Sequence, residues 1–416
     1  MNPEVRHHLF LACLRTELTD DVAADLSQLP VEAWEQLLDL AAQQRVGPLM
    51  YQRLKAHRLA SLVPAPTWER WKKLYFKNAG RNLRLYHELG QILRALRERH
   101  IPVLVLKGGF LASAVYRDPA LRYMSDIDLL VPPGDVPAAL ERLLALGYQS
   151  SGPFIVEQYL ALKHHLPPFG KPGAMAAVEV HWSITSPDQP WAIAPDELWT
   201  RAVPATIAGV KVLSLCPEDL LLHLCLHATY HHLAELFWQG ISPLCDVDQT
   251  VRHYQTALDW DHVRQRADAW GWGKGVYLIL YLARELLKTP IPDQVLSSLQ
   301  PASFSTRIAE AAITQLLADK RPMQMMTSDF ARLWGDASLV KKARLFLSRL
   351  FPPPRAMALY YPVPYNSPKI FLYYPARFRH LFRRYSSKVW RLWRGDQEIA
   401  ALTNNQNTVS SWLEQS

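Results

Sequence analysis

The chain has 416 residues, of which 49% are hydrophobic and 20% are charged. This composition can bury a sizeable core and excludes a disordered chain, and the length predicts two or three domains. Lys and Arg total 46 against 38 Asp and Glu, so the net charge is +8, and its distribution matters more than its sum. The four cysteines are widely spaced and form no CxxC pair, so a structural zinc site is not expected.

The N-terminal residues carry no sign of a secretory leader, because Arg15 and Glu17 interrupt their short apolar run. No run of about 18 apolar residues, the length needed to span a bilayer, occurs in the chain. Together with the few cysteines, these features predict a cytoplasmic protein, or one bound peripherally at the inner face of the membrane.

The apolar pattern divides the chain into four regions. Apolar residues three and four apart predict an N-terminal helical region over 1–100. Short apolar runs at 101–106, 126–131 and 177–182 predict strands, and they alternate with helical segments, which indicates an α+β core over 101–215. Helical spacing returns in a C-terminal helical domain over 216–350. A Pro-rich, basic aromatic tail follows over 351–416, and its last 20 residues are polar and are expected to fray.

Asp126 and Asp128 are the most informative residues. Because strand residues two apart point to the same side, both carboxylates face one way on a strand that is otherwise apolar. Such crowding costs stability unless a cation lies between them, and Mg²⁺ is the natural cation because it prefers oxygen ligands. If the third strand lies beside this one, Glu179 joins the cluster, and three acids can hold two metal ions. The alternative is a solvated strand face that happens to carry two acids.

Gly108 and Gly109 end the first predicted strand. A glycine pair in this place lets backbone N–H groups approach a phosphate closely, although a plain tight turn needs the same residues. The spacing matches neither GxGxxG nor GxxxxGK, so neither a Rossmann fold nor a P-loop is supported.

The run LKGGFLASAVYRDPALRYMSDIDLLV, followed by VEVHW, resembles the uncharacterised nucleotidyltransferase family of the polymerase-beta-like superfamily. The later segments PEDLLLHLCLHATYHH, LCDVDQTV and RLFPPPRAMALYY are also similar to that family. Gly108 and Gly109 match its glycine turn, Asp126 and Asp128 match its metal-binding pair, and Glu179 matches its third acid. The resemblance implies a small mixed-sheet nucleotidyltransferase core between N-terminal and C-terminal helical regions.

The resemblance also implies the reaction, which is transfer of a nucleoside monophosphate from an NTP to an acceptor hydroxyl or phosphate, with release of pyrophosphate. Asp126, Asp128 and Glu179 would be the catalytic residues and would hold two Mg²⁺ ions, with Mn²⁺ as the alternative. Glu179, or the metal, would lower the pKa of the acceptor hydroxyl.

The expected nucleotide-binding residues are those of the glycine turn and of the approach to the second strand. The amides of Gly108 and Gly109 would hold the β- and γ-phosphates, and Lys107 and Arg122 would neutralise phosphate charge, with Ser125 beside them. The alternative for Lys107 is that it simply ends a strand in solvent.

Two further groups of polar residues have no assigned role. His223, His227 and His231 lie on one stripe of a predicted helix, so they could bind zinc, or they could be hydrogen-bonded or nucleotide-facing. Asp246 and Asp248 could join the active site from the helical portion or could cap helices.

The basic character of the chain is concentrated in residues 341–395, which contain thirteen Lys and Arg and no Asp or Glu. The segment therefore carries +13, which leaves −5 for the remainder of a chain of net charge +8. Aromatic residues at helical spacing among the arginines favour an anionic membrane surface as a partner, and RNA less strongly. The alternative is that the aromatic stripe packs onto the body of the protein and leaves the arginines solvated.

Three functions remain open from the sequence. The first is an active nucleotidyltransferase with an NTP and an unidentified acceptor as partners. The second is a toxin-like transferase that modifies tRNA or a protein. The third is a catalytically inactive relative that binds a membrane or a nucleic acid.

Overall fold

The computed structural model describes residues 1–187, 189, 191, 193–230, 240–318, 339–361, 363–393 and 397–414. Within these residues, a mixed sheet of seven strands lies among helices, so the predicted α+β fold class is confirmed. The strands run in the order β3-β4-β5-β2-β1-β7-β6. Their bounds are Leu104–Val105 (β1), Asp126–Leu130 (β2), Gln149–Ser150 (β3), Phe169–Gly170 (β4), Ala177–His181 (β5), Val203–Ile207 (β6) and Val210–Ser214 (β7).

The three strands predicted from the sequence, β1, β2 and β5, are neighbours in the middle of the sheet, and each is shorter than its apolar run. β2 runs antiparallel to β1 and parallel to β5. Helix α5 (Ala65–Arg97) contacts β7, and helix α7 (Val136–Ala145) contacts β5. Between β1 and β2 the chain forms the short helix α6 (Lys107–Phe110) and one turn of π-helix, η2 (Leu111–Val115).

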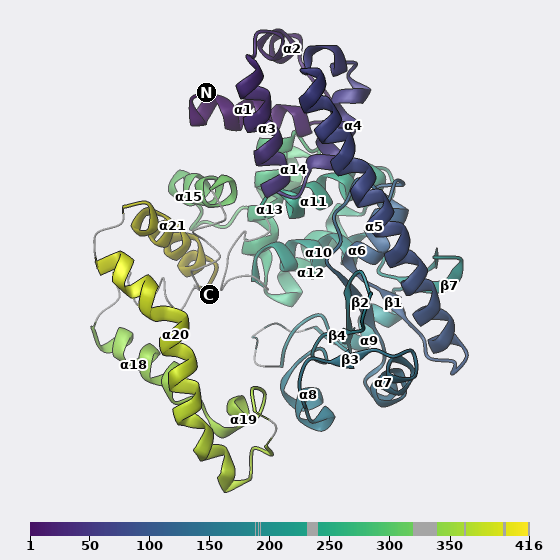
Figure 1. Cartoon of the computed structure of the whole chain (residues 1–416), viewed down its shortest axis with the longest axis vertical. Coiled ribbons are helices and arrows are strands. Elements are labelled where there is room, and N and C mark those ends of the chain that lie inside the picture. The colour runs from purple at the N-terminus through teal and green to yellow at the C-terminus, as the bar shows by residue number, and fades with distance from the viewer. Residues whose placement is uncertain are drawn as a thin grey trace.

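The N-terminal region is helical as predicted. Its longest helix, α5, buries a stripe that includes Trp71, Leu85 and Leu89, and it runs from the other N-terminal helices down to the sheet (Figure 1). The remaining helices of this region are α1 (Pro3–Leu14), α2 (Asp20–Ser27), α3 (Val31–Gln43), α4 (Gly47–Ala56) and the 3-10 turn η1 (Ala60–Leu62).

The helices that follow the sheet in sequence pack beside it, and α10, α11 and α13 contact one another. Their bounds are α10 (Pro217–Ala228), α11 (Ser242–His253), α12 (Trp260–Trp270), α13 (Gly273–Leu287), α14 (Asp293–Leu299) and α15 (Thr306–Leu317). Shorter elements within the core are η3 (Pro133–Asp135), α8 (Val156–Leu162) and α9 (Pro195–Thr200).

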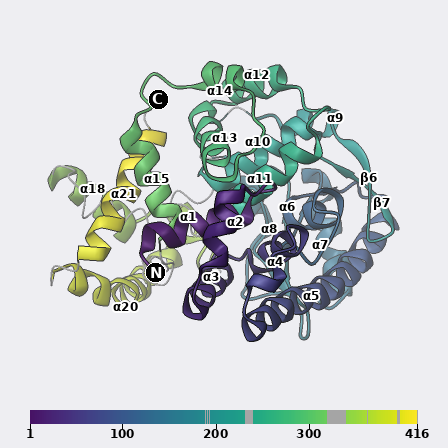
Figure 2. The same cartoon turned by 90° about the horizontal axis from the view of Figure 1, so that it is seen from above.

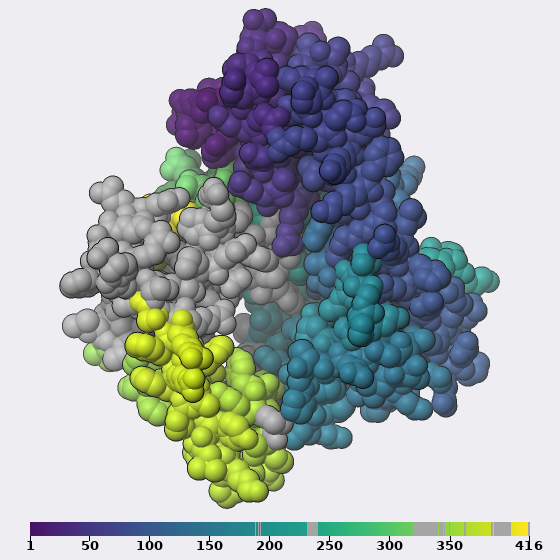
Figure 3. All heavy atoms as spheres, viewed as in Figure 1, coloured from purple at the N-terminus to yellow at the C-terminus, as the bar shows by residue number. Residues whose placement is uncertain are grey.

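The C-terminal part lies at one side of the molecule, where α19 and α20 reach its surface (Figure 3). Its elements are α18 (Leu339–Leu350), α19 (Pro354–Met357), the 3-10 segment η5 (Pro368–Tyr373), α20 (Tyr374–Trp393) and α21 (Gln397–Glu414). A small apolar cluster of Met357, Val363 and Ile370 holds α19 against η5.

The expectation that the last 20 residues fray is wrong for residues 397–414. They form α21, which lies along α15 (Figures 1 and 2) and buries Leu402, Val409, Trp412 and Leu413. Of the helices in the described part of the chain, none combines the length and the apolarity that crossing a bilayer requires.

Candidate functional site

The candidate site lies on one face of the neighbouring parallel strands β2 and β5. Their register places Asp128 beside Glu179 and Leu130 beside His181. Because paired residues of adjacent strands share a face and side chains alternate along a strand, Asp126, Asp128, Glu179 and His181 point to the same side. The strand of Glu179 therefore lies beside that of Asp128, which is the condition under which Glu179 joins the two aspartates. The opposite side is apolar and buried through Ile127, Leu129, Val178 and Val180.

Three side chains of this face converge on one point. The Nε2 atom of His181 lies 3.0 Å from Oδ1 of Asp128 and 3.5 Å from Oε2 of Glu179. One donor atom from each of the three residues lies within 4.8 Å of the other two, which is close enough for a shared metal ion. Asp128 and His181 are only 1% and 3% exposed, whereas Asp126 and Glu179 are partly buried. Asp126 lies at the outer end of the cluster and is not one of the three.

Lys107 provides positive charge at the cluster. Its Nζ atom lies 3.3 Å from Oδ2 of Asp128, and the side chain is only 13% exposed, so the alternative in which Lys107 ends a strand in solvent is wrong. The backbone φ of Lys107 is +43°, a left-handed conformation that costs a non-glycine residue about 1–2 kcal/mol. The amide of Leu106 donates to the carbonyl of Asp128 at 3.0 Å and fixes the start of this turn against β2.

The two aspartates differ in their electrostatic surroundings. Burial and the charge of Asp128 raise the pKa of Asp126 above its usual value. Burial would also raise the pKa of Asp128, but the charge of Lys107 and the hydrogen bond from His181 outweigh it and hold that pKa well below its usual range. Burial would lower the pKa of His181, but its bonds to Asp128 and Glu179 raise it instead. Of the two aspartates, Asp128 therefore keeps its charge to a lower pH than Asp126 does.

Arg122 is held by an acid from the helical region. Its Nε and Nη2 atoms donate to the two carboxylate oxygens of Asp246 on α11, both at 2.8 Å, and the hydroxyl of Tyr116 donates to the same carboxylate at 2.9 Å. Burial would lower the pKa of Arg122, but Asp246 raises it above its usual value. Asp246 is therefore not a member of the carboxylate cluster and does not cap a helix. It is connected to the site through its ion pair with Arg122.

The glycine pair lies in the first turn of α6, and space limits both positions. A Cβ at Gly108 would lie 2.3 Å from Nη1 of Arg122, so the guanidinium rests directly against this glycine. A Cβ at Gly109 would lie 2.9 Å from the side chain of Val105, so Gly109 allows α6 to pack closely on β1. Ser125 is exposed immediately before β2.

Polar residues of α5 position the loops that enter β2 and β5. Arg81 donates to the carbonyl of Met124, two residues before β2 begins, and at 2.8 Å to that of Met175, two residues before β5 begins. Asn78 and Asn82 both donate to the carbonyl of Arg122, at 3.1 and 2.8 Å. The sequence analysis missed these residues, because only the fold brings the middle of α5 next to both loops.

The sequence analysis also missed a group of histidines beside the acids. The rings of His165 and His164 lie 4.9 and 5.6 Å from that of His181. Burial and the nearby charge of His181 lower the pKa of His165. The alternation of strand side chains could have found His181, because it stands two residues after Glu179.

The other predicted polar residues lie outside the cluster. His223 is buried and His227 is partly buried on α10, whereas His231 lies outside the described residues. Asp248 accepts hydrogen bonds from Nε of Arg252 and from the hydroxyl of Thr289, both at 2.8 Å, so it joins α11 to the end of α13 and takes no part in the site.

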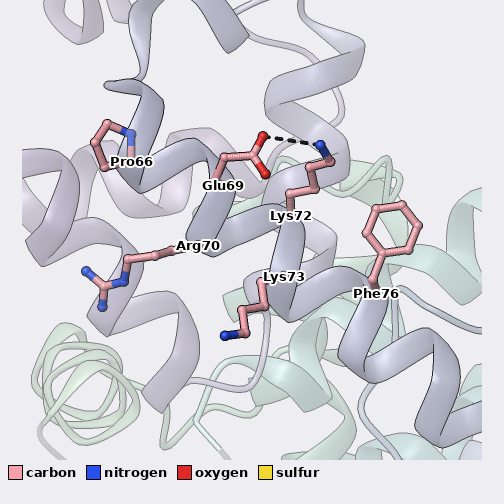
Figure 4. A pocket seen from close by; sticks show the side chains of 6 residues that line it. All are labelled: Pro66, Glu69, Arg70, Lys72, Lys73 and Phe76. Atoms are coloured by element: carbon pink, nitrogen blue, oxygen red, sulfur yellow. Dashed lines mark hydrogen bonds and ion pairs between the residues drawn. The ribbon is translucent and has the colours of Figure 1, made fainter.

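An open surface pocket of about 420 Å³ lies on α5 (Figure 4). Its lining residues are Pro66, Glu69, Arg70, Lys72, Lys73 and Phe76. None of them belongs to the carboxylate cluster, so this pocket is separate from the candidate site.

Comparison with known proteins agrees with the geometry of the cluster. A family model described as "Uncharacterised nucleotidyltransferase" matches residues 30–288, which include α5, the whole sheet, and α10 to α13. Neither a search of curated proteins nor a search of solved structures returned a match.

Proposed function

The chain belongs to this family of uncharacterised nucleotidyltransferases, and from that premise we propose that it moves a nucleoside monophosphate from an NTP to an acceptor. The observation that carries the proposal is the pairing of Asp128 with Glu179 across two parallel strands, with Asp126 on the same face. Two divalent ions bound by these three carboxylates would polarise the α-phosphate and stabilise the charge that develops on the leaving oxygen.

The donor set fits a metal ion. Oδ2 of Asp128 is buried, and the Lys107 ammonium forms an ion pair with it at 3.3 Å. A buried carboxylate is costly unless a cation compensates it, and a metal ion held by Asp128, Glu179 and His181 would do so in place of the ammonium. Asp126, Asp128 and Glu179 would hold the ions, which would supply positive charge to the phosphates.

The chemical step is an in-line displacement at the α-phosphorus. The acceptor oxygen forms a bond to that phosphorus, and the bond between the phosphorus and the α,β-bridging oxygen breaks, which releases pyrophosphate. Glu179 would accept the proton of an acceptor hydroxyl, because its partly buried carboxylate is reachable from solvent. An acceptor phosphate has no proton to give and needs no base.

The triphosphate would lie across the glycine turn. Gly108 lacks a side chain, so the Arg122 guanidinium lies directly against its backbone, and its N–H belongs to the first turn of α6, where helical amides have no intrahelical acceptor. Lys107 would move from Asp128 to a phosphate oxygen once metal ions neutralise the acids. Arg122, fixed by Asp246 beside Gly108, and Ser125 would contact the same phosphates.

The test is transfer of label. The protein is incubated with α-labelled ATP, CTP, GTP and UTP in cell extract with Mg²⁺ or Mn²⁺, and the labelled product is identified. Label on tRNA or on a protein would favour the toxin-like alternative, and label on a sugar or lipid would favour biosynthesis. Absence of label with every nucleotide, together with absence of metal-dependent thermal stabilisation by any NTP, would favour an inactive relative.

We propose a second function, attachment to an anionic membrane, for the surface formed by η5 and α20. Leu372, Phe378 and Phe382 are 76%, 54% and 65% exposed. Arg379 and Arg383 are exposed beside them, one turn apart on α20. The exposure of Phe378 and Phe382 argues against the alternative in which these two side chains pack onto the protein body.

Charge complementarity selects the partner. The segment 341–395 carries +13 without an acid, and each Lys or Arg near an anionic bilayer contributes about 1 kcal/mol. Aromatic rings among these charges would enter the headgroup region.

Co-sedimentation with phosphatidylcholine vesicles of increasing phosphatidylglycerol content tests the attachment. We expect intact protein to sediment at low salt and the double variant Phe378→Ser/Phe382→Ser to remain in the supernatant. Phe76→Ser is the matched control, because Phe76 is 59% exposed but lies on α5 (Figure 4). Retention by single-stranded RNA without sedimentation on vesicles would overturn the membrane proposal.

A further inference from the structure

The carboxylate cluster contains a nitrogen donor that neither the Asp-x-Asp pattern nor the match to the family assigns. We propose that His181 is a direct metal ligand together with Asp128 and Glu179, and that this position therefore selects Mn²⁺ over Mg²⁺. The inference deepens the proposed function and rests on the carboxylates being its metal site.

The distances between donors fit a metal ion. With bonds of about 2.1 Å, adjacent ligands of an octahedral ion lie about 3.0 Å apart. The Nε2 atom of His181 lies 3.0 Å from Oδ1 of Asp128 and 3.5 Å from Oε2 of Glu179. The Glu179 side chain is partly exposed, so it can adjust by the few tenths of an ångström that separate the second distance from the ideal one.

The imidazole is fixed in this orientation. His181 is 3% exposed and belongs to β5, which is paired with β2 on one side and β4 on the other. The amide of Val131 donates to the carbonyl of His181 at 2.9 Å, and the ring of His165 packs 4.9 Å from its ring. A buried ring held in this way keeps Nε2 directed at the carboxylates, whether or not a metal ion is bound.

The surroundings of Asp128 already attract positive charge to this point. The side chain is only 1% exposed, and its two oxygens face different partners. Oδ2 lies 3.3 Å from Nζ of Lys107. One oxygen of Asp128 therefore faces His181, and the other pairs with the Lys107 ammonium, whose charge a bound metal ion would replace.

The kind of donor determines the metal. Mg²⁺ strongly prefers oxygen ligands and retains its water, whereas imidazole suits transition metals, and Mn²⁺ accepts both imidazole and carboxylate. One nitrogen among two carboxylates therefore favours Mn²⁺ at this position. Asp126 lies outside the three-residue group, so the second ion would have oxygen donors only.

The test measures metal binding without nucleotide. Electron paramagnetic resonance of free Mn²⁺ gives the dissociation constant, and competition gives that of Mg²⁺. His181→Gln replaces the nitrogen donor with an oxygen donor of similar reach, so we expect Mn²⁺ affinity to fall at least about tenfold and Mg²⁺ affinity to change less than about threefold. His87→Gln is the control, because it removes an imidazole that is exposed on α5 and lies outside the donor set, and it should change neither affinity by more than about threefold.

A spectroscopic measurement on the wild-type protein keeps the inference testable even if His181→Gln does not fold. Spin-echo modulation from a directly bound imidazole nitrogen should appear on the bound Mn²⁺. Mn²⁺ bound without nitrogen coupling, or equal loss of both metal affinities in a folded His181→Gln variant, overturns the inference. A different result would contradict the proposed function: bound Mn²⁺ that shows coupling to a nitrogen, together with no nucleotidyl transfer from any NTP.

Discussion

Arg122 and Asp246 form a two-pronged ion pair that joins the loop before β2 to helix α11, with both N···O distances at 2.8 Å. The pair is almost completely buried, and Nη1 of the same guanidinium rests against Gly108. The helical region therefore positions the glycine turn of the candidate site, even though it contributes no ligand to the carboxylate cluster.

Asp246→Asn tests this relationship. Removing one partner of a buried pair leaves Arg122 uncompensated, so we expect the free energy of unfolding to fall by about 3 kcal/mol and NTP affinity to fall with it. Asp248→Asn is the matched control, because Asp248 is equally buried on the same helix but pairs with Arg252 away from the site. Urea denaturation and nucleotide titration should show comparable destabilisation in both variants and weakened NTP binding only in Asp246→Asn.

Asp126→Asn and Asp128→Asn should differ in their effect on the stability of the metal-free protein. The fold raises the pKa of Asp126, so loss of its charge should leave the free energy of unfolding unchanged or raise it by about 1 kcal/mol. The fold lowers the pKa of Asp128, which balances Lys107 and His181, so loss of its charge should destabilise the protein by about 2–3 kcal/mol. Urea denaturation in the presence of a metal chelator measures the free energy of unfolding of both variants.

The same two variants should both lose nucleotidyl transfer by at least about a hundredfold with metal present, since each removes a ligand charge. Full transfer by a folded Asp128→Asn protein would contradict the assignment of the site.

Glu179→Gln should lower turnover while NTP affinity stays nearly intact, because a base acts on the acceptor and not on the nucleotide. Steady-state kinetics and nucleotide titration separate the two effects. Parallel loss of both quantities would instead make Glu179 chiefly a ligand of the nucleotide-bound metal.

Gly108→Ala and Gly109→Ala should separate binding from packing. A methyl group at 108 meets Arg122 at 2.3 Å and displaces the guanidinium, so NTP affinity should fall about tenfold or more. A methyl group at 109 meets Val105 at 2.9 Å inside the core, so the main effect should be a loss of about 1–3 kcal/mol in stability. Thermal denaturation with and without NTP compares them.

Trp412→Ala tests the packing of α21 on α15. Trp412 is 4% exposed, so the truncation should cost about 3 kcal/mol of stability. Ser411→Ala, at the exposed neighbouring position, is the control and should change the free energy of unfolding by less than about 0.5 kcal/mol. Equal melting temperatures for Trp412→Ala and the wild type would show that α21 contributes nothing to the folded state.

Local pattern predicts the part of the site that lies on strands. The alternation of side chains indicated that Asp126 and Asp128 share a face, and the apolar run around Glu179 predicted the strand that carries it. His181 follows the same alternation, two residues after Glu179, but a search for acidic side chains alone does not find it. Asp246 could not be placed in this way, because it reaches Arg122 across 124 residues through the packing of helices.

The C-terminal helix was missed for a different reason. The segment is polar on average, although four of its residues lie at helical spacing on one stripe. These residues, Leu402, Gln406, Val409 and Leu413, are buried in the structure, where α21 packs on α15. Hydrophobic spacing was the better guide there than average polarity.

Helix α21 also determines how the surface of α20 is presented. Because α21 contacts both α15 and α20, the aromatic and arginine side chains of α20 are connected through α21 to the helices of the C-terminal domain. If α20 binds a bilayer, the face of β2 and β5 that carries the carboxylates would lie at a fixed distance from the lipid surface and in a fixed orientation. An acceptor anchored in that membrane would then need its reacting oxygen at that distance from the lipid surface. The length of the acceptor, as well as its chemistry, would decide whether it can react.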